Sequence, residues 1–232
     1  MNRKPEERTR RYRELAQREP RFQALLDTYG KVDPFAWPDG GRTAGSKFAA
    51  LVLHIAGQRI TATAAFAVFD RIAALTGGIP QPTTIAALDV MGLRATGLSG
   101  SKARYILALA ESEISGRVDL ESLGGLPDRE VLAVLTSLPG IGTWTAQMFL
   151  VRQLHRPDVL PAGDPGIRNA VQELLHRKEL PSISATEAVA RNWSPNRSYA
   201  AALLWRSLAP ADQIADPKER ALAKEARKRA GG

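Results

Sequence analysis

The sequence contains no cysteine, and this absence excludes several kinds of site at once. Disulfides, thiol catalysis, cysteine-ligated zinc and iron–sulfur clusters all require that residue. The three histidines, His54, His155 and His176, stand far apart without ligand spacing, so nothing indicates a transition-metal site. No apolar run approaches the roughly twenty residues of a transmembrane helix, and the charged N-terminus shows no secretory signal pattern. We therefore expect a cytoplasmic protein without a membrane partner.

Acidic and basic residues balance through most of the chain, and the excess of positive charge is confined to its ends. Residues 1–21 hold eight Lys/Arg and four Glu, and residues 217–232 hold six Lys/Arg and two Glu, so each end contributes +4 to the net charge of +8. A basic excess fits a nucleic-acid partner. Solvated, fraying helical ends explain it equally well.

The alternating pattern of a strand is also lacking, and apolar spacing instead predicts helices throughout. The predicted helices cover Lys47–Leu75 with a bend at Gly57–Arg59, Thr83–Leu88, Ser101–Ser115, Pro127–Ser137, Thr143–His155, Pro165–Lys178, Ser184–Trp193 and Pro195–Leu208. Met91–Gly100 is expected to be a glycine-rich connection. Ser184 and Glu187 have the spacing of a capping box, and Ser194-Pro195 that of a cap followed by a first-turn proline.

Two of the predicted helices are joined by the short segment Leu138–Gly142 (LPGIG). Its glycines permit backbone shapes closed to other residues, and they leave N–H groups uncovered at the start of the next helix, where an anion can bind. The candidate phosphate-binding residues are Pro139, Gly140, Ile141, Gly142 and Thr143. A monovalent cation on the carbonyls of Leu138 and Ile141 would share that phosphate. A tight turn without a ligand explains the same spacing.

The segment Pro161–Gly166 (PAGDPG) places an aspartate directly before a proline. Asp164 is a suitable helix N-cap and Pro165 a suitable first helical residue, so a helix start alone accounts for the pair. A carboxylate can cap a helix and still face a ligand. Its place one helix after the Leu138–Gly142 segment favours this second role without excluding the first.

Several further segments occur in a fixed order with these two. They are Ile55–Thr61 (IAGQRIT), Leu93–Ser99 (LRATGLS), Leu138–Ala146 (LPGIGTWTA) and Trp193–Ala200 (WSPNRSYA), followed by Trp205. In this combination the chain resembles the helix-hairpin-helix–Gly/Pro–Asp DNA glycosylases, and within them the 3-methyladenine DNA glycosylase II branch. The resemblance covers roughly residues 45–208, and several motifs in order make it far more specific than one glycine-rich turn.

The resemblance implies an enzyme that flips a damaged nucleotide out of duplex DNA and hydrolyses its N-glycosidic bond. Asp164 would be the catalytic carboxylate, stabilising positive charge on the sugar, positioning the attacking water, or both. Trp144 and Trp205 would line the base pocket and stack on electron-poor alkylated purines. Met148 and Pro165 stand where well-known members carry aromatic residues, so the expected pocket is less aromatic.

The resemblance also assigns a wedge that fills the gap left in the duplex. This role falls on the turn formed by Gln58 and Arg59, with Arg59 inserting; a surface arginine on a helix bend is the plain alternative. Relatives that also cut the strand use a lysine where this chain has Trp144. Because no lysine lies between Lys102 and Lys178, no lyase activity is expected.

Other residues carry weaker signals. His54 lies in an apolar helix pattern and is expected to be a core residue. Lys102 and Arg104 suit either phosphate contact or a solvated helix face. Arg197 and Tyr199 are expected to brace the last core helix behind Asp164.

The expected fold is all-α, with two helical lobes and the active-site cleft between them. Residues 46–160 would form the lobe with the wedge turn and hairpin, and residues 1–45 plus 161–232 the lobe with Asp164. The expected partner is damaged double-stranded DNA, bound by a nucleoid-associated monomer. No cofactor is expected beyond a structural monovalent cation.

Three alternative functions stay open. The first is a glycosylase for deaminated or oxidised bases, which activity on a lesion panel would separate. The second is a non-catalytic helix-hairpin-helix DNA-binding module, which would be indifferent to Asp164. The third is a helix-turn-helix regulator with sequence-specific base contacts, but no helix displays a suitable set of polar side chains.

Overall fold

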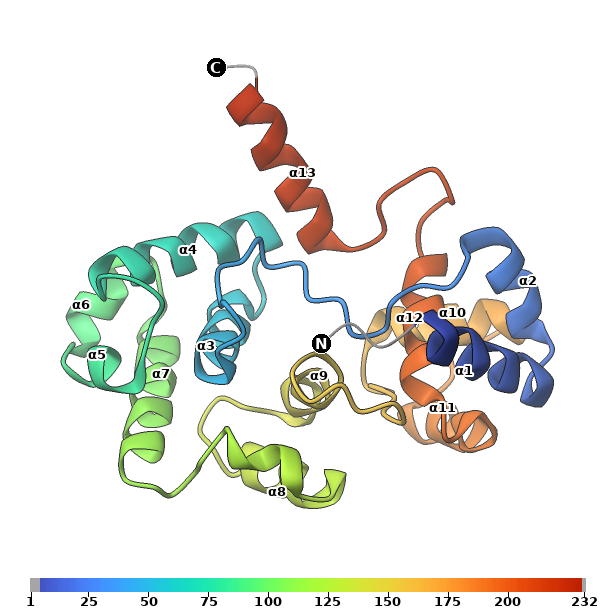
Figure 1. The fold of residues 1–232 in the computed structure, drawn as a ribbon, viewed down its shortest axis with the longest axis horizontal. Coiled ribbons are helices and arrows are strands. Elements are labelled where there is room, and N and C mark those ends of the chain that lie inside the picture. The colour runs from blue at the N-terminus through green and yellow to red at the C-terminus, as the bar shows by residue number, and fades with distance from the viewer. Residues whose placement is uncertain (1–4, 231–232) are drawn as a thin grey trace. The chain divides into compact units, whose positions relative to one another are not determined.

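The computed structural model describes residues 5–230, and all regular secondary structure in this range is helical (Figure 1). The α-helices are α1 (Pro5–Arg18), α2 (Arg21–Tyr29), α3 (Lys47–Gly57), α4 (Ala62–Leu75), α5 (Pro82–Ala86), α6 (Val90–Ala95), α7 (Gly100–Ile114), α8 (Asp128–Thr136), α9 (Thr143–Arg152), α10 (Pro165–Leu174), α11 (Ile183–Ala190), α12 (Arg197–Ser207) and α13 (Pro217–Ala230). Short 3₁₀ helices cover Ser122–Gly125 and Arg191–Trp193. Since residues 5–230 contain no strand, the predicted all-α class is confirmed.

The chain divides into two compact units. Unit 1 is Met1–Trp37 with Leu150–Asp216, and unit 2 is Pro38–Phe149 with Pro217–Gly232. This division differs from the expected lobes in three places: 38–45 and the C-terminal segment belong to unit 2, and 150–160 to unit 1. The boundary after Phe149 falls inside α9.

Aromatic side chains build the core of unit 1. The rings of Tyr12 in α1 and Tyr199 in α12 pack edge to face with their centroids 5.2 Å apart. The rings of Phe22 and Trp193 pack in the same way at the same distance. All four side chains are fully buried, and each such ring contributes about 2–3 kcal/mol of apolar burial. The Tyr12 hydroxyl donates to the Val32 carbonyl at 2.8 Å, and burial raises the pKa of that hydroxyl. The arginine-rich helix α1 is therefore packed into the core, which argues against the fraying alternative for this end.

Helix α3 is the central helix of unit 2, because its side chains are buried on all sides from Phe48 to Ala56. A helix that is apolar all round belongs in a core. Phe66 and Phe69 of α4 belong to the same core. The predicted bend at Gly57–Arg59 is confirmed: α3 ends at Gly57 and α4 begins at Ala62.

The C-terminal helix α13 packs on α4 within unit 2. Ala221 is buried, and a side chain at Gly40 would overlap a methyl of Leu222. Arg42 forms ion pairs with Asp70 at 2.8 Å and with Glu225 at 3.1 Å. These contacts order the second basic end of the chain, so they also argue against the fraying alternative for residues 217–230.

The segment Met91–Gly100 is not only a connection, since it contains most of the short helix α6. Asp89 caps this helix by accepting a hydrogen bond from the Gly92 N–H at 2.7 Å. The glycine content of the segment led to the prediction of a loop, although Asp89 is a residue type that favours a helix start.

Two later helices begin elsewhere than predicted. Helix α11 is capped by Ser182, whose hydroxyl accepts from the Ala185 N–H at 3.1 Å, so the predicted capping box at Ser184 is wrong. Helix α12 begins at Arg197 with Asn196 as its N-cap. The Ser194–Pro195 peptide bond is cis, and the proline lies outside the helix.

None of the helices within residues 5–230 has both the length and the apolar character needed to span a membrane.

Candidate functional site

Asp164 of unit 1 is the N-cap of α10. Its Oδ1 accepts the Ile167 N–H at 3.0 Å, and its backbone is extended, at φ −70° and ψ 123°, as an N-cap requires. Pro165 follows at the first helical position. Asp164 is only partly buried, so the capping residue keeps some exposed surface at the positive end of the α10 dipole.

Trp205 of α12 lies beside this carboxylate. Its indole Nε1–H points at Asp164 Oδ1 over 3.4 Å, and the guanidinium of Arg152 lies 5.5 Å from the centre of its ring. Gly166 makes this approach possible, because a Cβ there would lie 3.0 Å from Asp164 Oδ1 and 2.8 Å from a methyl of Leu208. The sequence pattern around Asp164 gives Gly166 no role, and only the packing of α12 on α10 gives it one.

A second aspartate fixes the start of α12. Asp158 accepts two hydrogen bonds from the Arg197 guanidinium, at 2.8 and 2.9 Å, and one from the Ser194 hydroxyl at 2.7 Å. Burial alone would raise the pKa of Asp158, but the hydrogen bonds and charge of Arg197, with Ser194, outweigh it and hold that pKa below its ordinary value. Arg197 thus braces the helix that carries Trp205.

Trp144 and Met148 of unit 2 are one turn apart on α9. The Trp144 side chain is 42% exposed, whereas Met148 is buried. The rings of Trp144 and His54 meet edge to face, 6.4 Å apart. His54 is buried, and it packs against the one candidate pocket residue of unit 2 that has a large exposed surface.

The Leu138–Gly142 hairpin has the left-handed residue its glycines predicted. Gly140 has φ +81°, and a Cβ there would lie 2.2 Å from the ring of Tyr105 on α7. Gly142 and Thr143 are exposed at the start of α9, where the first N–H groups of a helix have no partner within the helix. The hairpin therefore combines a glycine required by packing with an exposed helix start suited to an anion.

The turn between α3 and α4 exposes Arg59 and Ile60. Arg59 has φ +59°, a left-handed conformation that is uncommon for a residue with a side chain. Ile60 is 42% exposed. The sequence predicted Arg59 at this tip and overlooked Ile60, whose exposure next to a charged residue cannot be read from its type.

Two side chains connect this turn to the hairpin and to α7. Gln58 Nε2 donates to the Gly140 carbonyl at 2.8 Å. Lys102 Nζ donates to the carbonyls of Ala56 and Gln58 at 2.9 and 2.7 Å. Desolvation lowers the pKa of Lys102. Gln58 thus ties the turn to the hairpin, and the Lys102 ammonium binds the end of α3, where carbonyls lack helical partners.

The structure brings the candidate residues together in two groups. In unit 1, Asp164, Pro165 and Trp205 adjoin, and Gly166 joins them. In unit 2, the Arg59 turn adjoins the hairpin. The contacts of Lys102 and Tyr105 were missed because they join segments far apart in sequence.

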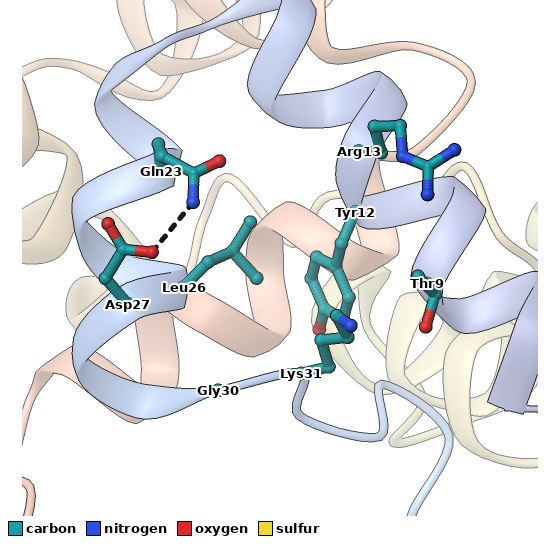
Figure 2. Close-up of a pocket in the computed structure, with 8 residues that line it drawn as sticks. All are labelled: Thr9, Tyr12, Arg13, Gln23, Leu26, Asp27, Gly30 and Lys31. Atoms are coloured by element: carbon teal, nitrogen blue, oxygen red, sulfur yellow. Dashed lines mark hydrogen bonds between the residues drawn. The ribbon is translucent and has the colours of Figure 1, made fainter.

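A separate hollow of about 480 Å³ lies between α1 and α2 of unit 1 (Figure 2). Its lining residues are Thr9, Tyr12, Arg13, Gln23, Leu26, Asp27, Gly30 and Lys31. Gln23 donates to Asp27 at 2.8 Å, and the charges around the hollow have both signs. It contains none of the candidate site residues. Residues 5–230 hold no cluster of three His, Asp or Glu side chains that could bind a metal ion.

A family model described as "HhH-GPD superfamily base excision DNA repair protein" matches residues 52–196. This segment contains the Arg59 turn, the hairpin, Asp164 and Asn196.

Named relatives and solved structures agree with this match. DNA-3-methyladenine glycosylase 1 of Schizosaccharomyces pombe is 36% identical over 168 residues, covering 70% of this chain and 72% of that protein. The putative DNA-3-methyladenine glycosylase YfjP of Bacillus subtilis is 34% identical over 129 residues, covering 56% of this chain and only 45% of that protein. The structure of the S. pombe enzyme Mag1 in complex with abasic DNA has a TM-score of 0.76 at 27% identity, covering 88% of this chain and 100% of that one.

Proposed function

Because the chain belongs to the HhH-GPD superfamily of base excision DNA repair proteins, we propose that it is a monofunctional DNA glycosylase. It flips alkylated bases of the 3-methyladenine type out of duplex DNA and hydrolyses their N-glycosidic bond. The observation that carries the proposal is the partly buried Asp164 at the N-terminus of α10, with its carboxylate beside the Trp205 indole.

Asp164 is the catalytic carboxylate of this proposal. Breaking the glycosidic bond builds positive charge on the sugar, and a carboxylate fixed nearby stabilises that charge. The Ile167 N–H and the Trp205 indole N–H both donate to Asp164 Oδ1, so the side chain is held in place before the substrate binds. The same carboxylate orients the attacking water.

Base recognition is assigned to Trp205 in unit 1 and to Trp144 in unit 2. Each offers an aromatic face to a purine whose ring is electron-poor after alkylation, and the attraction combines stacking with a cation–π contribution. Met148 and Pro165 are the non-aromatic members of this set. Because neither side chain has an aromatic ring to stack on a base, they would select the base by the shape of the pocket.

DNA engagement is assigned to the turn and the hairpin of unit 2. Arg59 and Ile60 form the wedge, a guanidinium that can hydrogen-bond beside an apolar tip that can only fill space. Gln58 holds the turn and does not insert, because its amide is engaged by Gly140. The hairpin N–H groups and Thr143 bind a phosphate.

A monovalent cation at the hairpin carbonyls of Leu138 and Ile141 is compatible with these residues. The Leu138 carbonyl accepts the Ile141 N–H at 3.2 Å, and a carbonyl oxygen has a second lone pair for a cation. When bound, the cation would supply positive charge to the same phosphate. Replacing potassium by tetramethylammonium at equal ionic strength should then weaken duplex binding.

The testing experiment is base release from methylated duplex DNA, with the freed bases identified chromatographically. The wild-type protein should release 3-methyladenine and leave the strands intact, since Trp144 stands where strand-cutting relatives carry their lysine. Asp164→Asn should slow release by about 10²–10³-fold, the usual loss for one electrostatic group. Its stability should hardly change, because asparagine caps a helix as well as aspartate does.

Asp27→Asn is the matched control in the same unit. It removes the same charge from an exposed carboxylate that pairs with Gln23, so it should release base at the wild-type rate. No release of any methylated base by folded protein that binds duplex DNA would overturn the assigned substrate. Activity would then be sought on deaminated and oxidised bases.

A further inference from the structure

Helix α13 carries a basic face that the proposed chemistry does not use. Lys224, Arg227 and Lys228 follow the i, i+3, i+4 spacing of one helix face, and all three side chains are exposed. The helix lies outside residues 52–196, so the family match gives it no role.

Other residues of α13, Ala221 and Glu225, fix this helix to unit 2. Arg42 reaches Glu225 with one guanidinium nitrogen and Asp70 of α4 with two, at 2.8 to 3.1 Å. The same guanidinium lies 4.3 Å from the centre of the Phe66 ring. Arg42 is itself largely buried, and pairs that are partly buried hold their geometry better than exposed ones. The basic face is therefore presented in a fixed direction, which a fraying helix would not do.

The part of α4 on which α13 packs lies close in sequence to the proposed wedge. Phe66 and Asp70 belong to α4, which begins at Ala62 immediately after the Arg59 turn. Phe66 is four residues from that start, or about 6 Å along the helix axis. The same helix therefore joins the turn that carries the proposed wedge to the part of unit 2 that holds α13.

We propose that α13 binds the DNA phosphate backbone through Lys224, Arg227 and Lys228 and adds affinity that does not depend on damage. The inference rests on the proposed function. Phosphate contacts from lysine and arginine position a protein on DNA without reading its bases. A lipid surface is disfavoured, because the one large apolar residue of α13, Leu222, lies against Gly40, and a membrane-binding helix needs an apolar face.

The test replaces the three side chains together, as Lys224→Gln, Arg227→Gln and Lys228→Gln in the full chain. Binding is measured against potassium chloride concentration for an undamaged duplex and for the same duplex with a tetrahydrofuran abasic analogue. Both affinities should fall by the same factor, and the slope of log K against log salt should become shallower by about 2 to 3. Base release at saturating enzyme should stay at the wild-type rate.

The matched control removes the same charge from exposed positions of unit 1, as Arg13→Gln, Arg177→Gln and Lys178→Gln. It should keep the wild-type salt slope. An unchanged slope in the α13 variant, an equal change in the control, or a loss confined to the abasic duplex would overturn the proposal. So would unchanged duplex binding with a loss of binding to phosphatidylserine vesicles. If the wild-type protein released no base while the slopes differed as stated, only the proposed glycosylase function would fall.

Discussion

Asp164 in unit 1 and Arg59 in unit 2 differ in where their support comes from. Asp164 is oriented chiefly by the helix it caps, through the N–H of Ile167 three residues on. The turn that carries Arg59 is held by Lys102 and by the Gly140 carbonyl, 44 and 82 residues from Gln58. A local cap fixes the proposed catalytic group, whereas a long-range network fixes the proposed wedge.

This difference means that the two functions should respond to different substitutions. Changes in α7 and the hairpin should disturb DNA engagement without touching the carboxylate. Changes around Asp164 should do the reverse. The following predictions test that separation, from the largest expected effect to the smallest.

The largest effect is expected from Gly140→Ala. Its φ of +81° disfavours any side chain, and the new Cβ would lie 2.2 Å from the ring of Tyr105, so the hairpin or α7 must move. The expected loss of unfolding free energy is about 3 kcal/mol from strain and overpacking together. Urea denaturation measures it. Gly142→Ala, two residues on and with open space around it, should cost less than about 1 kcal/mol, and equal losses would contradict this account of the hairpin.

Lys102→Met removes the donor shared by the carbonyls of Ala56 and Gln58. We expect a loss of about 1–3 kcal/mol of stability, the range for leaving such groups unsatisfied. The preference for an abasic analogue over undamaged duplex should fall about tenfold, since 1.4 kcal/mol corresponds to that factor. Fluorescence of 2-aminopurine beside the abasic analogue should report a less disturbed base stack. Lys102→Arg should restore part of the preference.

Two comparisons show whether Lys102 acts through the turn. Arg104→Met, on the same helix but with an exposed side chain, should leave the preference unchanged. In an Arg59→Ala background, Lys102→Met should reduce it by less than in the wild-type background, because coupled residues are not additive. Full additivity would reduce Lys102 to a stabilising residue.

Arg59→Ala should weaken binding to the abasic analogue by about 1 kcal/mol and binding to undamaged duplex by less, because the gap that Arg59 fills exists only in the former. Titration of both duplexes at one salt concentration measures this. Arg129→Ala in the same unit, whose side chain is 87% exposed, should leave both affinities unchanged. Equal losses for Arg59→Ala on the two duplexes would make Arg59 a general phosphate contact.

The smallest effect concerns acid stability through Asp158. Its pKa is lowered in the folded state, so its contribution is fully present above the ordinary value of 3.8 and is lost as the pH falls through the lowered value. Denaturation of the wild-type protein should therefore show a drop in stability below about pH 4 that is absent in Asp158→Asn. The same drop in both proteins would remove Asp158 as its source.

The sequence was most informative where a structure depends on neighbouring residues. The Asp164-Pro165 helix start, the bend at Gly57–Arg59 and the left-handed turn at Gly140 all follow from local backbone preferences. The all-α class follows from apolar periodicity over many residues.

It was less informative where partners come from distant segments. Lys102 looked like a solvent-facing or phosphate-binding residue, because the residues around it in the sequence do not indicate that it donates to carbonyls at the end of α3. The sequence did not decide between fraying and DNA contact for the two basic ends, because the docking of α13 by Arg42 and the burial of Tyr12 depend on tertiary contacts. Ser194-Pro195 looked like a helix start, although Asn196 is the N-cap.

One measurement tests the separation of the two roles directly: single-turnover release of 3-methyladenine at saturating enzyme, set beside affinity for the abasic analogue. Asp164→Asn should lose about 10²–10³-fold in release and bind the analogue almost as tightly as wild type. Arg59→Ala should bind the analogue more weakly and release base within a few-fold of the wild-type rate once saturated. If both variants lost release and affinity in the same proportion, carboxylate and wedge would not be separate, and the central claim would be contradicted.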